Sequence, residues 1–77
     1  MNKRILLVDD ERNLNQLVAT NLKFEGYETE SAYSGIEAID KLGRFSPDLM
    51  VLDVMMPGMD GFEVLEHLRH ASSIPVI

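Results

Sequence analysis

The stretch PDLMVLDVMMPGMDG, residues 47–61, decides how this chain folds. Four consecutive apolar residues, 49–52, run directly into Asp53. A short apolar run is typical of a strand that is buried on both faces, as in a parallel sheet. Ligands of open α/β sheets bind just beyond the carboxyl ends of the strands. Asp53 is therefore expected where such a fold binds ligands or carries out chemistry.

A second run of this kind lies near the start of the chain. Residues 5–8 read ILLV and lead into Asp9 and Asp10. If the two strands are neighbours, Asp9, Asp10 and Asp53 converge at one edge of the sheet. Three carboxylates repel one another there, and Mg²⁺, which prefers carboxylate oxygens, a carbonyl and waters, removes the conflict. Such a site also suits phosphoryl transfer, with one carboxylate as the nucleophile.

Apolar residues at helical spacing predict two helices. The first spans residues 11–25, with Asp10 as its N-cap and Gly26 as its end. Taken alone, Asp10 is better explained by this capping role than as a ligand. Ser34 begins the second helix with a capping box, and Gly43 marks its end. The side chains expected to face the core are Leu14, Leu17, Val18, Leu22, Ile36, Ile39 and Leu42.

The remaining segments continue the alternation of strand and helix. Residues 27–32 are polar and alternating, which favours an edge strand. A third helix is expected after the turn, with Phe62, Leu65 and Leu68 toward the core, and residues 74–77 begin a fourth strand. Strands that alternate with helices over short connections predict an α/β fold, a parallel sheet with helices on both faces.

Composition excludes several classes of function. The chain has 77 residues, 45% of them hydrophobic, which is typical of one small globular unit. The net charge of −6 argues against direct contact with nucleic acid. The sequence contains no cysteine and no run long enough for a membrane span. A cytoplasmic protein without membrane contact is the expectation.

Five stretches together resemble a known family. They are RILLVDDE at 4–11, GYE at 26–28, SGIEAI at 34–39, PDLMVLDVMMPGMDGFEVL at 47–65 and IPVI at 74–77. In these stretches the sequence resembles the receiver domain of two-component response regulators, which is CheY-like. The resemblance implies an α/β, flavodoxin-like fold: a parallel sheet of order 2-1-3-4 with three helices in this chain.

The resemblance also implies a role for each acidic residue. Asp53 matches the family's phosphoacceptor, which takes a phosphoryl group from a sensor histidine kinase. Asp10 and Asp53 match direct Mg²⁺ ligands, and Asp9 matches a ligand that acts largely through water. The backbone carbonyl of Met55 matches the remaining protein ligand. Full-length relatives often carry a DNA-binding output domain, so transcription regulation is expected by analogy.

The sequence departs from the family pattern by ending after the fourth strand. Residues 1–77 match the N-terminal portion of a receiver domain, without the family's fourth helix, fifth strand and fifth helix. The family's switch Ser or Thr and its Lys fall outside this portion. Impaired phosphorylation is therefore expected. Self-association into a homo-oligomer is expected to complete the fold, because exposed strand edges invite pairing.

Two other functions compete with a signalling module. An aspartate-nucleophile phosphohydrolase resembles this arrangement but carries a second Asp two residues after the nucleophile. Met55 occupies that position, which argues against an enzyme. A self-assembling interaction fragment without phosphotransfer is the other alternative. Binding of Mg²⁺ or beryllofluoride distinguishes it from a phosphoacceptor.

Overall fold

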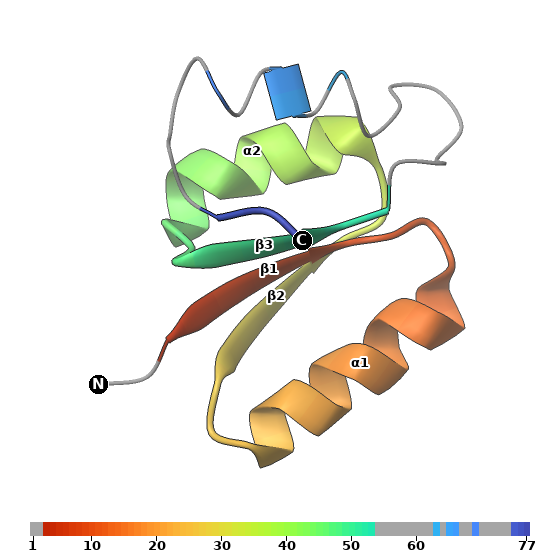
Figure 1. Ribbon diagram of the computed structural model, residues 1–77. Coiled ribbons are helices and arrows are strands. Elements are labelled where there is room, and N and C mark those ends of the chain that lie inside the picture. Colours follow the sequence, from red (N-terminus) through yellow and green to blue (C-terminus); the bar gives the residue numbers. More distant parts are fainter. Residues whose placement is uncertain (1–2, 54–62, 64, 67–68, 70–74) are drawn as a thin grey trace.

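The computed structural model describes residues 3–53, 63, 65–66, 69 and 75–77. Helices and strands alternate along the chain (Figure 1). Residues 63, 65, 66 and 69 are also helical. The named elements are β1 (Arg4–Val8), α1 (Arg12–Phe24), β2 (Glu28–Ala32), α2 (Gly35–Phe45) and β3 (Leu49–Leu52). Across this described part of the chain, no helix has the length and apolar character needed to cross a membrane.

The strands form a parallel sheet in the order β2-β1-β3. Val76 forms a parallel bridge to Met50 of β3. Two backbone bonds flank it: Met50 N–H donates to the Pro75 carbonyl at 3.0 Å, and Ile77 N–H donates to the Met50 carbonyl at 2.9 Å. Residues 75–77 therefore lie beside β3, as the predicted order 2-1-3-4 requires. The prediction that β2 is an edge strand fits this order.

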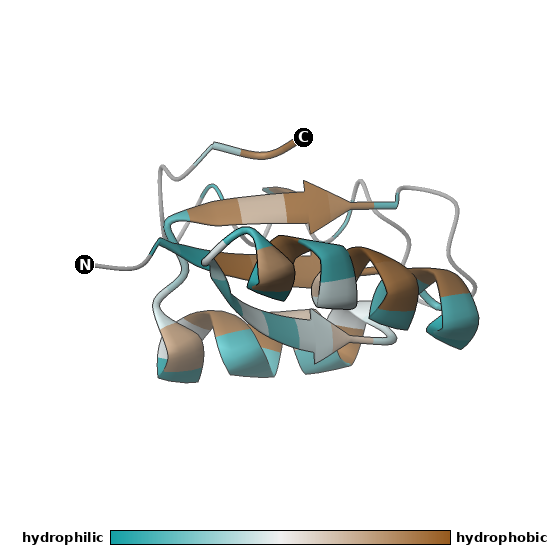
Figure 2. Ribbon diagram, turned by 90° about the horizontal axis from the view of Figure 1, so that it is seen from below, coloured by the Kyte–Doolittle hydropathy of each residue, from teal (hydrophilic) through white to brown (hydrophobic). Residues whose placement is uncertain are grey.

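The helices cover opposite faces of the sheet, α1 on one and α2 on the other (Figure 1). Successive side chains of β1 point to alternate faces, so this central strand contributes to two core clusters. Figure 2 shows β1 and β3 as mainly hydrophobic and the edge strand β2 as more polar. The buried residues of the α2 face are Leu6, Val8, Ala32, Ala38 and Met50. Those of the α1 face are Ile5, Leu7 and Ala19, with Val18, Leu22, Leu49 and Val51 packed against them.

The buried faces of the helices differ in part from the prediction. Leu14 and Leu17 of α1 are 48% and 58% exposed, and Ile36 of α2 is 72% exposed. These three expectations were wrong, because the inward face of α1 centres on Asn15 and Ala19, and that of α2 on Gly35 and Ala38. The predicted contacts that the structure confirms are those of Val18, Leu22, Leu42 and Leu65. Phe62 and Leu68 lie outside the described residues.

The N-cap of α1 is Glu11, not Asp10 as predicted. The Glu11 carboxylate accepts a hydrogen bond of 3.2 Å from the backbone N–H of Asn13. The Glu11 N–H itself donates to Oδ1 of Asp9 at 2.9 Å. The helix therefore begins one residue later than predicted, with Glu11 as its N-cap. Asp10 is exposed and does not cap the helix. Gly26 follows the helix with φ +98°, as its predicted terminating role requires.

The ends of α2 are set by Ser34 and Ser46. Ser34 Oγ accepts from the Glu37 N–H at 3.1 Å, and the Glu37 carboxylate accepts from the Tyr33 N–H at 3.2 Å. The predicted capping box therefore forms, except that the Glu37 carboxylate accepts from the N–H of Tyr33 and not from that of Ser34. The helix does not end at Gly43 as predicted but continues to Phe45, which packs against the core, and Ser46 ends it with φ 51°.

Candidate functional site

Two neighbouring strands bring Asp9 and Asp53 to the same edge of the sheet. Val8, the last residue of β1, pairs with Leu52, the last residue of β3. The Asp53 N–H donates to the Val8 carbonyl at 2.9 Å, which extends this ladder by one residue. On the other side, the Asp9 N–H donates to the carbonyl of Ala32 at 3.1 Å. Both aspartates are thus held by the sheet itself and not by a free loop.

The carboxylates of Asp9, Asp10 and Asp53 form one acidic cluster. One oxygen from each residue lies within 4.8 Å of the others. Asp9 and Asp53 are half-buried, and Asp10 is exposed. The structure therefore brings together the three residues that the sequence predicted to converge. This donor set, hard oxygens carrying three negative charges at short range, fits Mg²⁺.

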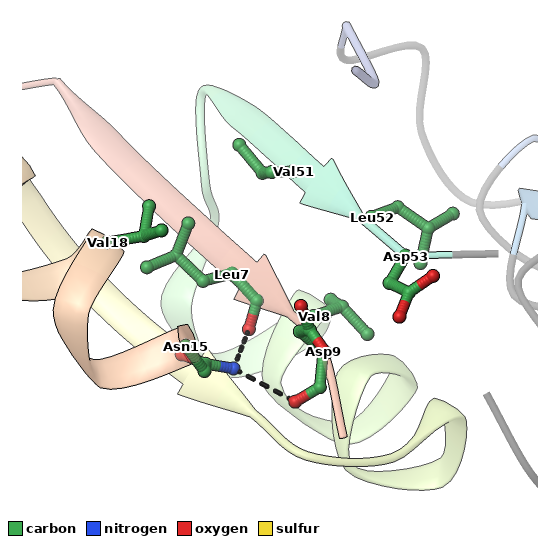
Figure 3. A pocket seen from close by; sticks show the side chains of 8 residues that line it. All are labelled: Leu7, Val8, Asp9, Asn15, Val18, Val51, Leu52 and Asp53. Carbon is green, nitrogen blue, oxygen red and sulfur yellow. Dashed lines mark hydrogen bonds between the residues drawn. The ribbon is translucent and has the colours of Figure 1, made fainter. Parts of the chain in front are cut away.

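The backbone around Asp9 is held by α1 as well as by β2. Asp9 Oδ1 accepts the Glu11 N–H at 2.9 Å, and the Asp9 carbonyl accepts from the side-chain amide of Asn15 at 3.1 Å (Figure 3). The amide, the carbonyl and the carboxylate of Asp9 each have a partner. The turn that carries Asp9 and Asp10 is consequently anchored at several points.

A hollow of about 230 Å³ adjoins the acidic cluster on the α1 side of the sheet. Figure 3 shows Asp9 and Asp53 together, with apolar side chains of both strands and of α1 nearby. Apolar walls lower the local dielectric and strengthen charge interactions at the site. The lining residues are Leu7, Val8, Asp9, Asn15, Val18, Val51, Leu52 and Asp53.

Asn15 is a site residue that the sequence pattern did not single out. It is 2% exposed, although asparagine in a helix is usually placed on the solvent side. Its spacing to Val18, Ala19 and Leu22, three, four and seven residues further on, places it on the inward face. That spacing is the feature that identifies it. The Met55 carbonyl, the remaining predicted ligand, lies outside the described residues.

Comparisons with known proteins agree with this geometry. Residues 5–77 match the response regulator receiver domain. Response regulator MprA of Mycobacterium bovis is 44% identical over 78 residues, which cover 100% of this chain and 34% of MprA. The chain thus spans about a third of the length of this curated relative.

Two solved structures show the same fold at high similarity. The receiver domain of the Francisella response regulator 1452 has a TM-score of 0.90 and 33% identity, with coverage of 97% of this chain and 63% of that one. Response regulator TrrA of Thermotoga maritima, solved in complex with Mg²⁺-BeF, has a TM-score of 0.83 and 46% identity, with coverage of 88% and 59%. The match over residues 5–77, the parallel sheet and the acidic cluster at its edge agree: this chain belongs to the response regulator receiver domain family.

Proposed function

We propose that this chain is the phosphoacceptor module of a two-component response regulator, with Asp53 as the acceptor. The observation that carries the proposal is the acidic cluster, in which Asp9, Asp10 and Asp53 come within 4.8 Å of one another at the carboxyl edge of the sheet. Members of the family are phosphorylated by histidine kinases and are generally signalling modules, not enzymes. The proposed donor is therefore the phosphohistidine of a sensor histidine kinase.

In the proposed reaction, a carboxylate oxygen of Asp53 attacks the phosphorus atom. A P–O bond forms, giving an acyl phosphate, and the P–N bond to the kinase histidine breaks with its electron pair left on the imidazole nitrogen. The half-buried Asp53 is oriented for this by the strand end and by the bond from its N–H to the Val8 carbonyl. Positioning of this kind supplies most of the catalysis in phosphoryl transfer.

Asp9 and Asp10 are proposed to hold Mg²⁺ together with Asp53 and the Met55 carbonyl. When bound, the cation neutralises the clustered carboxylates and the charge on the phosphoryl oxygens. The fit rests on the donor set in the structure, since hard carboxylate oxygens are the ligands that Mg²⁺ prefers. The Thermotoga relative, solved with Mg²⁺-BeF, supports the same assignment here.

The wider assignments extend from the family. We propose that residues 1–77 form the N-terminal portion of a receiver domain that acts in the cytoplasm. Regulation of transcription by the parent protein is proposed by analogy alone, because the chain covers 34% of MprA.

A titration with Mg²⁺ and beryllofluoride tests the proposed site. In the unmodified chain, backbone NMR signals of residues 9, 10 and 53 are expected to shift with Mg²⁺, and beryllofluoride should bind only when Mg²⁺ is present. The Asp53→Asn variant should lose beryllofluoride binding. Asp40→Asn is the matched control, since Asp40 lies on α2 and pairs with Arg44 at 2.9 Å. Equal binding by Asp53→Asn and the unmodified chain would refute the assignment of the acceptor.

Self-association is a second proposal, favoured by exposed apolar side chains. Leu14 and Leu17 of α1 are 48% and 58% exposed, and Ile77 beside β3 is 75% exposed. Such surface favours burial against another copy of the chain. Sedimentation at micromolar concentration should show a dimer or larger species, and Leu17→Glu should shift it toward monomer. A monomer in the unmodified chain would rule the proposal out.

A further inference from the structure

The side chain of Asn15 lies where three backbone carbonyls converge. Its amide nitrogen is 3.3 Å from the Leu7 oxygen, 3.1 Å from the Asp9 oxygen and 3.3 Å from the Ala32 oxygen. Leu7 belongs to β1, Ala32 ends β2, and Asp9 begins the turn that leads into α1. One buried amide from α1 therefore joins the ends of two strands to the acidic turn.

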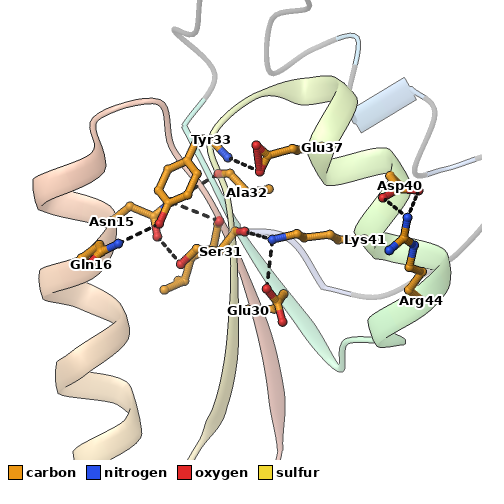
Figure 4. Close-up of polar contacts among 11 residues, drawn as sticks. Asn15, Gln16, Glu30, Ser31, Ala32, Tyr33, Glu37, Asp40, Lys41 and Arg44 are labelled. Carbon is orange, nitrogen blue, oxygen red and sulfur yellow. Dashed lines mark hydrogen bonds and ion pairs between the residues drawn. The ribbon is translucent and has the colours of Figure 1, made fainter.

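The orientation of this amide is determined by Ser31. Ser31 Oγ donates to Asn15 Oδ1 at 2.6 Å (Figure 4). A reversed amide would place Oδ1 against three carbonyl oxygens, which are acceptors only. Ser31 is held in turn from α2, because its carbonyl accepts a hydrogen bond from Lys41, whose ammonium group also pairs with Glu30 at 2.9 Å. A chain of hydrogen bonds thus runs from α2 through β2 to Asn15.

The contact at Asp9 bears directly on the acidic cluster. Rotation of the Asp9 peptide would break the bond from Asn15 to the carbonyl of Asp9. The same turn carries the bond from the Glu11 N–H to the Asp9 carboxylate, at 2.9 Å. Removing the Asn15 amide would also take away the hydrogen bond to the half-buried Asp9 carbonyl, which favours rearrangement of the turn; the Ala32 carbonyl would keep its bond from the Asp9 N–H.

We propose that Asn15, oriented by Ser31, is the positioning residue of the acidic cluster: it fixes the turn that presents Asp9 and Asp10 to the cation. The role assigned to Asn15 is to position the ligands, because its amide nitrogen bonds the Asp9 carbonyl and its oxygen accepts from Ser31. The consequence for cation affinity rests on the function proposed above, whereas the anchoring of the turn does not. Partners one layer behind metal ligands typically influence metal affinity by about 10-fold to 100-fold.

Three variants test the proposal. Asn15→Leu removes the amide at similar volume, and Ser31→Ala removes only the hydroxyl that orients it. Leu22→Ala is the matched control, since Leu22 packs on the same face of α1 but away from the turn. Mg²⁺ affinity is measured by calorimetry at a temperature where circular dichroism shows each variant folded. Amide hydrogen exchange of the Glu11 N–H, which donates to Asp9, gives a readout that needs no metal.

The proposal predicts that Asn15→Leu weakens Mg²⁺ binding by about tenfold or more and accelerates exchange at Glu11. Ser31→Ala should show the same two changes to a smaller degree, and it decides the outcome if Asn15→Leu does not fold. Leu22→Ala should lose stability but keep both properties. Unchanged exchange and affinity in the Asn15 and Ser31 variants would overturn the proposal.

Failure of the proposed metal site would be recognised separately. If the unmodified chain bound no Mg²⁺, the function proposed above would be wrong. The exchange rate at Glu11 would then decide the role of Asn15 alone: faster exchange in Asn15→Leu than in Leu22→Ala supports it, and equal rates refute it.

Discussion

The backbone N–H of Asp53 donates a hydrogen bond of 2.9 Å to the carbonyl oxygen of Val8. Val8 ends β1 and is followed directly by Asp9 and Asp10. This one bond, which continues the pairing of β1 with β3, sets the proposed acceptor beside the two residues proposed to hold Mg²⁺. The pairing of β1 with β3 therefore positions the acidic cluster. Substitution of a cluster carboxylate should alter Mg²⁺ binding and leave the fold intact.

Asp10→Asn is expected to weaken Mg²⁺ binding while leaving thermal stability nearly unchanged. Asp10 is exposed, and Glu11 caps α1 in its place, so the substitution removes a charge from the cluster but no structural contact of the helix. Calorimetric titration with Mg²⁺ and a thermal melt without it measure the two effects. A large loss of stability with unchanged affinity would show that Asp10 acts as a cap after all.

Mg²⁺ is expected to raise the melting temperature, because it binds the folded cluster and relieves the repulsion among Asp9, Asp10 and Asp53. At about 100 times its Kd, a ligand specific to the folded state adds about 2.7 kcal/mol to the free energy of unfolding. Chelation with EDTA should reverse the shift. A salt of equal ionic strength without a divalent cation is the control, and an equal shift in that salt would contradict specific binding.

Leu6→Ala is expected to destabilise the fold by about 2–5 kcal/mol. Leu6 is 0% exposed and lies in the cluster between β1 and α2, so truncation leaves a cavity. Phe24→Ala is the matched control, since Phe24 is 91% exposed at the end of α1. Urea denaturation measures both variants. Similar free energies of unfolding for the two would contradict the assigned core.

The central strands and their acidic ends were predictable from sequence because burial on both faces leaves a simple pattern. The apolar run 49–52 followed by Asp53, and the run 5–8 followed by Asp9, imply convergence of the aspartates once the two strands are neighbours in a parallel sheet. The sheet order came from the resemblance to a family, since no local pattern states which strands are neighbours. The predicted order agrees with the observed order β2-β1-β3 and with the bridge between Met50 and Val76.

The helices were less predictable because apolar spacing does not say how wide the buried face is. Leu14 and Leu17 fit the helical period but lie outside the contact of α1 with the sheet. Asn15 interrupts the apolar pattern yet lies at the centre of the buried face, because its amide bonds three backbone carbonyls at the strand ends. A tertiary requirement of this kind leaves no trace in hydrophobic periodicity. Gly43 does not end α2 for a related reason: the helix continues to Phe45, which packs against the core.

Asp53 is proposed to accept a phosphoryl group in a reaction that depends on Mg²⁺. The most direct measurement is intact-mass and peptide analysis after incubation with a phosphorylated histidine kinase, in Mg²⁺ and in EDTA. We expect one phosphoryl group, labile to alkali and to hydroxylamine, on the peptide that contains Asp53, formed only with Mg²⁺ and absent in Asp53→Asn. A phosphoryl group that persists in Asp53→Asn, or that forms equally in EDTA, would contradict it.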